Sequence, residues 1–155
     1  MKTIQSILFT LLLPWLLVLP VQAEDIEKAV YHVDFANADR YSATLTSINN
    51  MLNEYENALV DYDVTIVFVG KGARFVTDDP KAGQDARLKE RRSELKGRLD
   101  ALHTTRNVKL TVCNNTLTGF GLTADKLYPG VEIVPSGVVH LAQLQKAGAA
   151  YIKIQ

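Results

Sequence analysis

The sequence predicts an α/β domain: a three-layer α/β/α sandwich built on a mainly parallel five-stranded sheet. Short segments with strand character alternate with longer amphipathic segments from about residue 27 to the end of the chain. This alternation is typical of a sheet that carries helices on both faces. One segment, 64–69, is an unbroken β-branched and aromatic run, as expected for a strand covered on both sides. The length of 155 residues fits one domain.

The individual elements follow from periodicity and from the residues that begin and end them. Apolar side chains recur at helical spacing from Leu45 to Leu59 and from Leu88 to Leu102. Asn37 or Asp39 is expected to cap the first of these helices, and Ser136 is a good N-cap for the last. We expect strands over 27–35, 64–69, 108–113, 131–134 and 151–154, and helices over about 39–59, 84–104, 116–120 and 137–147.

The first 23 residues have the layout of a secretory signal peptide. A single lysine precedes an apolar run over 7–19, and the segment ends in the small residue Ala23. An uncleaved anchor is the alternative, but the run is short for a membrane span of about 20 residues and prolines interrupt it. We therefore expect a signal peptide at 1–23, cleavage near Ala23 and a mature domain over 24–155. The mature form should be periplasmic or secreted and not bound to a membrane.

Charge is balanced overall and uneven along the chain. There are 17 basic and 17 acidic residues, so the composition does not predict a nucleic-acid partner, which would need a basic surface. Segment 24–63 is mainly acidic, whereas segment 81–100 is mainly basic. The usual meaning of such segments is a solvated face, and a complementary contact between subunits is the more specific alternative.

Cys113 is the residue most suited to chemistry. It is the only cysteine, so no internal disulfide can form. It ends the third predicted strand, and ligands of open α/β sheets gather at the carboxyl ends of strands. A helix start just after it would stabilise a thiolate, so we expect a thiol more acidic than that of a free cysteine. Asn114, Asn115 and Thr116 could hydrogen-bond a sulfur anion or simply cap the helix, and a small buried core residue is the alternative for Cys113 itself.

Other motifs do not predict a cofactor or a metal. The segment 70–72 is Gly-Lys-Gly, but the further residues of a phosphate-binding loop or a dinucleotide fingerprint are missing. His32, His103 and His140 do not have the spacing of a zinc site. A Cys113–His pair for covalent hydrolysis has no local motif in its favour.

Three segments in order along the chain carry a family resemblance. They are Val112-Cys113-Asn114-Asn115-Thr116-Leu117, Pro135-Ser136-Gly137-Val138 and Gly148-Ala149-Ala150-Tyr151-Ile152. With them the chain resembles the DsrE/DsrF family of small sulfur-relay proteins from about residue 30 to 154. The resemblance implies a three-layer α/β fold, assembly into trimers or hexamers, and a persulfide carried on a cysteine whose position here is Cys113.

The function implied is that of a periplasmic thiol protein that accepts or carries sulfane sulfur on Cys113 without a cofactor. Its partners would be copies of itself and sulfur donors and acceptors, either proteins or small sulfur compounds. Whether this transfer makes the protein an enzyme stays open. The family's relays work in the cytoplasm, so an exported member cannot be assumed to share their partners. The first alternative is a non-catalytic oligomeric binding module with a buried, inert Cys113, and a Cys–His hydrolase is a weaker one.

Overall fold

The computed structural model describes residues 26–155. The predicted signal peptide lies outside the described residues. Five strands form one sheet in the order β4-β3-β2-β1-β5, and every pair of neighbours is parallel. The predicted three-layer sandwich with a five-stranded sheet is confirmed. The strands are β1 (Glu27–Val33), β2 (Tyr62–Phe68), β3 (Lys109–Cys113), β4 (Val131–Val134) and β5 (Ala150–Ile152).

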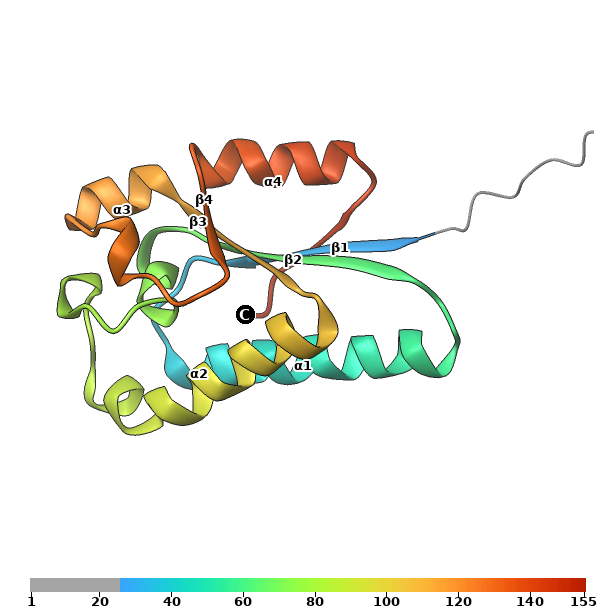
Figure 1. Ribbon diagram of the computed structural model, residues 1–155, viewed down its shortest axis with the longest axis horizontal. Helices are drawn as coiled ribbons and strands as arrows, with labels where there is room; N and C mark the ends of the chain where they lie inside the picture. The colour runs from blue at the N-terminus through green and yellow to red at the C-terminus, as the bar shows by residue number, and fades with distance from the viewer. Residues whose placement is uncertain (1–25) are drawn as a thin grey trace, which may run out of the picture.

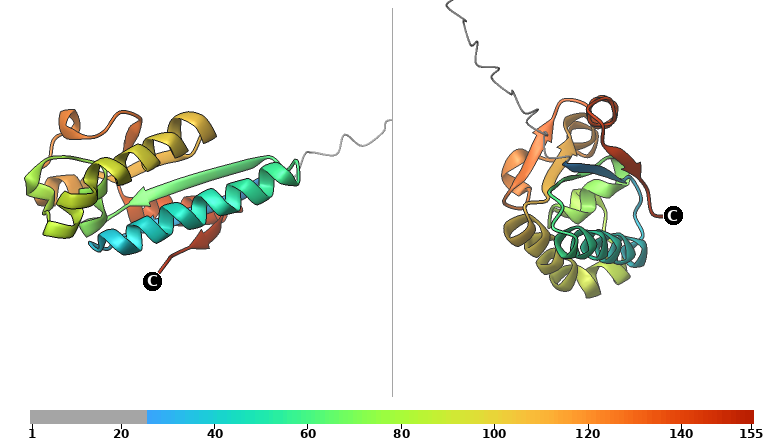
Figure 2. Two further views of the ribbon diagram at one scale, coloured as in Figure 1. Left: turned by 90° about the horizontal axis from the view of Figure 1, so that it is seen from below. Right: turned by 90° about the vertical axis from the view of Figure 1, so that its right-hand side faces the viewer.

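Helices cover both faces of this sheet. Figure 1 shows α1 (Ala38–Asn57) and α2 (Ala86–Arg106) below the sheet and α4 (Gly137–Lys146) above it. The view along the strands in Figure 2 shows the same layers from the end. The helices are α1 (Ala38–Asn57), α2 (Ala86–Arg106), α3 (Asn114–Phe120) and α4 (Gly137–Lys146), and three short 3₁₀ segments are η1 (Gly70–Phe75), η2 (Pro80–Ala82) and η3 (Ala124–Lys126). Among residues 26–155, no helix is both long and apolar enough to cross a membrane.

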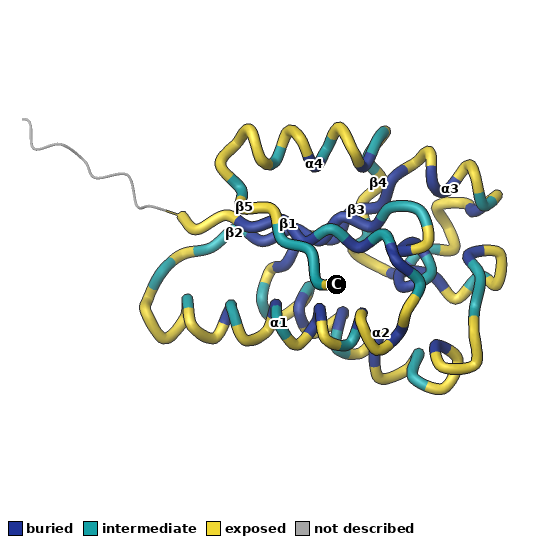
Figure 3. Tube along the Cα trace, turned by 180° about the vertical axis from the view of Figure 1, so that it is seen from behind, coloured by how far each residue is buried: buried dark blue, intermediate teal, exposed yellow. Residues whose placement is uncertain are grey.

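The two faces of the sheet are buried to different extents. Successive residues of a strand point to opposite faces, so Tyr31 and Val33 join the large core under α1 and α2. Val30 instead joins a small cluster with Val67 and with Leu141 of α4. Figure 3 shows the contrast, with the central strands buried and most of the outer surface of α4 exposed. The α4 layer is therefore thin, and groups beneath it lie near the surface.

The expected elements are all present, and several of their boundaries differ from the sequence expectation by one or two residues. Asn37 caps α1 by accepting from the amide of Arg40, so it fills the role for which Asp39 was the other candidate. Asp85 caps α2, which therefore begins at residue 86 and not at 84. The short third helix was expected at 116 but begins at Asn114, directly after β3. The last strand covers 150–152 because it pairs with β1 over three positions.

Part of the uneven charge of the chain is used in contacts between α1 and α2. Arg91 of α2 lies 2.8 Å from Asp39 at the start of α1. Near the other end of both helices, Arg106 forms an ion pair with Glu56. The acidic and basic segments thus meet within one chain, which neither of the two sequence interpretations had anticipated. Ion pairs this close to the surface contribute little stability each, so their main effect is to align the two helices.

Candidate functional site around Cys113

Cys113 lies at the junction of a buried strand and a helix. It is the last residue of β3 and the N-cap residue of α3, with no loop between the two elements. Its neighbour Val112 belongs to the large core, so the Cys113 side chain points to the opposite face, under α4. Only 5% of Cys113 is exposed. The thiol is therefore shielded, although the layer that covers it is thin.

A second helix start meets the thiol from the other side. Gly137 is the first residue of α4, and Ser136 caps this helix by accepting from the amide of Val139. A Cβ atom added to Gly137 would lie 3.0 Å from the Cβ of Cys113. The backbone of α4 thus begins in contact with Cys113. Figures 1 and 3 show α3 and the beginning of α4 toward the same end of the sheet.

The two helix starts change the acidity of the thiol. Burial is the largest single influence and raises the pKa of Cys113, because a thiolate loses hydration there. The backbone amides of Gly137, Thr116 and Asn115 and the hydroxyl of Thr116 all act in the opposite direction by stabilising the thiolate. Together they outweigh burial, so the pKa of Cys113 lies below its ordinary value. This is the chemistry expected of a thiol at a helix N-terminus.

The predicted site residues take different places around Cys113. Thr116 is buried, and its hydroxyl accepts a 2.8 Å hydrogen bond from the amide of Gly70, which follows β2. Asn115 is exposed and acts on the thiol through its backbone amide. Asn114 is exposed at the first position of α3. The side chain of Thr116 therefore takes part in the site, whereas the two asparagines contribute the helix start and not a buried amide group.

Gly137 is a site residue whose contact with Cys113 the sequence did not predict. The sequence identified a helix opening at Ser136 and a strand ending at Cys113, but these elements are separated by α3 and β4. Their contact depends on how β4 returns beside β3 and on where α4 crosses the sheet. A glycine directly after an N-cap serine was the available signal, since serine explains the cap and leaves the glycine unexplained.

The three histidines are engaged elsewhere or do not act on Cys113. Nδ1 of His32 lies 2.8 Å from the hydroxyl of Tyr151, and Nδ1 of His103 lies 3.0 Å from the carbonyl oxygen of Val108. Among the residues described, the groups that shift the pKa of Cys113 most include no histidine. The residues from 26 onward also contain no cluster of three or more His, Cys, Asp or Glu side chains arranged to hold a metal ion. A Cys–His hydrolase thus receives no support from the geometry.

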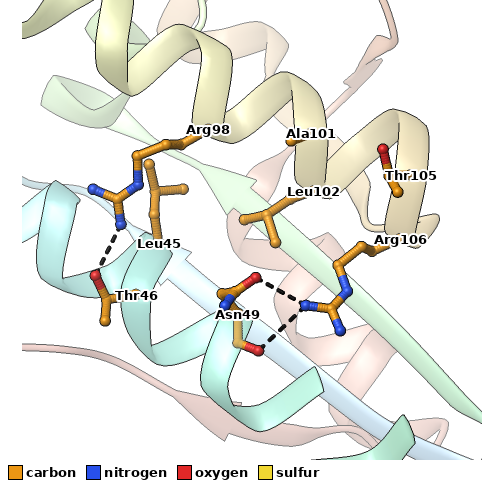
Figure 4. A pocket seen from close by; sticks show the side chains of 8 residues that line it. All are labelled: Leu45, Thr46, Asn49, Arg98, Ala101, Leu102, Thr105 and Arg106. Carbon is orange, nitrogen blue, oxygen red and sulfur yellow. Dashed lines mark hydrogen bonds between the residues drawn. The ribbon is translucent and has the colours of Figure 1, made fainter. Parts of the chain in front are cut away.

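Two surface cavities lie away from Cys113. One, of about 410 Å³, lies between α2 and Tyr128. The other, of about 380 Å³, lies between α1 and α2. Figure 4 shows its arginines, Arg98 and Arg106, donating to Thr46 and Asn49 across the two helices. Because these guanidinium groups already bind α1, they do not form a free anion site. Neither cavity brings a reactive group together with a helix start as the Cys113 site does.

Comparisons with known proteins identify the family and support the fold. A search of curated proteins gives no match. A solved structure of MTH1491 from Methanobacterium thermoautotrophicum, described as a protein of unknown function, has 25% sequence identity and a TM-score of 0.65, and the match covers 82% of this chain and 98% of that one. The structure of the ychN protein from E. coli has 20% identity and a TM-score of 0.55, with 83% and 99% covered. The model of the DsrE/DsrF-like family matches residues 28–154, so the chain belongs to that family.

Proposed function

We propose that the protein is an exported carrier that holds sulfane sulfur as a persulfide on Cys113. Membership of the DsrE/DsrF-like family supports a sulfur-relay type of protein in general. The observation that carries the more specific proposal is the convergence of two helix starts on one cysteine. Backbone amides at a helix start favour a negative charge, and the thiolate is the form of cysteine that attacks sulfur.

Loading would be a thiol–persulfide exchange. The Cys113 thiolate attacks the outer sulfur of a donor persulfide or polysulfide, and a new S–S bond forms to Cys113. The S–S bond of the donor breaks, and the donor leaves as a thiolate or sulfide with the electron pair. The proton stays on the transferred sulfur. No outside oxidant or reductant is needed, because one S–S bond replaces another.

Unloading would repeat the same step in the other direction. The thiolate of an acceptor attacks the outer sulfur of the Cys113 persulfide, and Cys113 leaves as a thiolate. A low pKa helps this second step, since a more acidic thiol is a better leaving group. The amides of Gly137, Thr116 and Asn115 stabilise the same anion whenever it is released. The site thus suits repeated loading and unloading of one cysteine.

Burial of Cys113 points to small sulfur compounds as donors. With only 5% of the residue exposed, a folded donor protein cannot bring its own cysteine to the sulfur without a movement of α3 or α4. Hydrogen polysulfide ions and low-molecular-weight persulfides need a much smaller opening than a folded protein does. We therefore favour small sulfur compounds over donor proteins for the loading step.

The location and assembly of the protein form the remainder of the proposal. The apolar run over 7–19 and Ala23 support export to the periplasm or beyond and removal of the first 23 residues. Val138 and Val139 on the outer face of α4 are 66% and 53% exposed. Such apolar side chains beside the site support a symmetric homo-oligomer, a trimer or hexamer, in which α4 contributes to the contact.

A second candidate function rests on the same burial. A non-catalytic oligomeric binding module would keep Cys113 as a small core residue, and its 5% exposure favours this view. The two candidates differ in the reactivity of the folded protein. A sulfur carrier should react with iodoacetamide in its native state at pH values below the ordinary pKa of cysteine. An inert thiol that reacts only after unfolding would support the binding module.

The direct functional test is a two-step transfer. The folded mature protein is treated with hydrogen polysulfide, freed of excess donor by gel filtration, and mixed with a small acceptor thiol. The proposal expects the acceptor to become persulfidated and Cys113 to return to the thiol form, as seen by alkylation and peptide mass spectrometry. Sulfur that stays on the protein, or that reaches the acceptor equally well from the Cys113→Ser variant, would contradict the carrier role.

A further inference from the structure

The contact between Gly137 and Cys113 has no space for a side chain. A Cβ atom on Gly137 would lie 2.6 Å from Cγ2 of Val69 and 3.0 Å from the Cβ of Cys113. The first of these separations is shorter than atoms tolerate without movement. Val69 follows β2, so the first residue of α4 fits into a gap between the ends of two adjacent strands.

Neither the helix nor the local backbone explains a glycine at this position. Gly137 is absent from the glycines with positive φ, so its conformation is open to any residue. Glycine also disfavours a helix relative to alanine. The serine before it already supplies the cap. The glycine therefore allows the first amide of α4 to lie close to the sulfur. At the same time, Leu141 of that helix packs on Val67 and Val30.

We propose that Gly137 is a positioning residue for the Cys113 thiolate, and that its missing side chain is what brings the start of α4 to the sulfur. The purpose of this positioning rests on the proposed sulfur-carrying function, whereas the contact between Gly137 and Cys113 is observed independently of it. With any larger residue, Val69 or α4 must shift, and a helix that moves outward carries its amide and its dipole away from the sulfur, where both act more weakly. Thr116 and Asn115 of α3 would then stabilise the anion alone.

The test is the pH profile of Cys113 alkylation by iodoacetamide in wild type and Gly137→Ala, with ultraviolet thiolate absorbance as a second readout. The midpoint should move to higher pH in Gly137→Ala, and the rate near neutral pH should fall by about two- to fivefold. The fall is modest because a less acidic thiol gives a more nucleophilic thiolate, so the plateau at high pH should be equal or higher. A helix displaced without electrostatic consequence would instead raise the rate at all pH values through greater exposure. A profile identical to wild type, or one raised uniformly, would overturn the inference.

Two further variants test whether the shift in the alkylation midpoint is specific to the contact made by Gly137. Gly119→Ala is the matched control, because Gly119 lies in α3 and an added Cβ would meet nothing within 4 Å. Its profile should equal that of wild type, and an equal shift there would overturn the inference. Val69→Ala removes the atom that lies 2.6 Å from the added Cβ, so the double variant Val69→Ala/Gly137→Ala should return toward the wild-type midpoint.

Circular dichroism would reveal whether Gly137→Ala folds. If it does not, a second variant, Ser136→Ala, provides the test instead. Ser136→Ala removes the cap of α4 without filling the gap, and it should loosen the start of α4 and shift the midpoint in the same direction. An unchanged midpoint in Ser136→Ala would then count against the inference. Failure of the carrier function is a separate observation. In that case wild type takes up no sulfur, whatever the Gly137 variant shows in alkylation.

Discussion

The hydroxyl oxygen of Thr116 accepts a 2.8 Å hydrogen bond from the backbone amide of Gly70. Thr116 lies in the first turn of α3, and Gly70 follows β2, so this bond ties the ends of two adjacent strands together. While its oxygen accepts from Gly70, its O–H can donate to the thiolate, and this hydroxyl helps to lower the pKa of Cys113. One buried side chain therefore serves both the structure and the chemistry of the site.

Replacing Thr116 by valine tests the role of its hydroxyl group without changing the shape of its side chain. Thr116→Val keeps the branched outline and removes the hydroxyl, so the pKa of Cys113 should rise and the amide of Gly70 should lose its acceptor. We expect a loss of about 1–3 kcal/mol in the free energy of unfolding from the unpaired amide. Thr116→Ser keeps the hydroxyl and should retain the wild-type alkylation profile. A valine variant that titrates like wild type would show that the hydroxyl does not act on the thiol.

The depressed pKa of Cys113 should also appear as a dependence of stability on pH. Between the folded-state pKa and the unfolded-state value of about 8.5, the unfolded chain binds more protons than the folded one. The free energy of unfolding of wild type should thus rise with pH across this interval, relative to Cys113→Ser, and this gain is lost as pH falls through the folded-state pKa. Urea denaturation of both proteins from pH 6 to about 9.5 measures the difference. A difference that stays flat or decreases with pH would mean that burial dominates the thiol.

Assembly through α4 gives a mutational prediction. Val138 is 66% exposed, so Val138→Asp should not disturb the fold, yet a charge at a packed interface should shift the oligomer toward monomer. Leu59→Asp is the control, because Leu59 is 94% exposed after the end of α1 and aspartate tolerates its left-handed backbone at φ 54°. Light scattering should show dissociation in the first variant only. Equal behaviour of the two variants would place the interface elsewhere, and a monomeric wild type would refute the assembly.

Export predicts a defined N-terminus. The mature protein should begin at Glu24, because cleavage is expected after Ala23. Cell fractionation followed by N-terminal sequencing of the protein expressed with its full sequence checks this. A chain that stays in the cytoplasm and retains Met1 would remove the basis for an exported role, while the chemistry of Cys113 would remain to be judged separately.

The parts predictable from sequence were those set by local physics. The β-branched run over 64–69, the leucine spacing of α2 and the serine cap of α4 each act within a few residues, and the structure agrees with them. The place of Cys113 at a strand end was predictable for the same reason. The gap that accepts Gly137 was not, because it forms only when the ends of β2 and β3 and the start of α4 come together. Likewise, the pairing of Arg91 with Asp39 depends on two helices packing side by side, which charge composition cannot specify.

The start of the third helix shows how a local preference can misplace the end of an element. The short third helix was expected from Thr116 onward because Asn114 and Asn115 favour caps and turns. In the structure, Cys113 itself takes the cap position without a side-chain bond, and the two asparagines enter the first turn. That earlier start brings the amides of Asn115 and Thr116 toward the sulfur. The two-residue difference leaves intact the expectation that a helix start directly after Cys113 stabilises its thiolate.

Uptake of sulfur by Cys113 in the folded protein is the property on which the proposed function depends most directly. Native mature protein and its Cys113→Ser variant are treated with hydrogen polysulfide near neutral pH, passed through gel filtration and measured by intact-mass spectrometry. Wild type should gain the mass of one or more sulfur atoms, located on Cys113 by peptide mapping, while Cys113→Ser should gain none and remain folded. A wild-type protein that is folded, reduced and unchanged in mass after this treatment would contradict the account and favour a binding module with an inert cysteine.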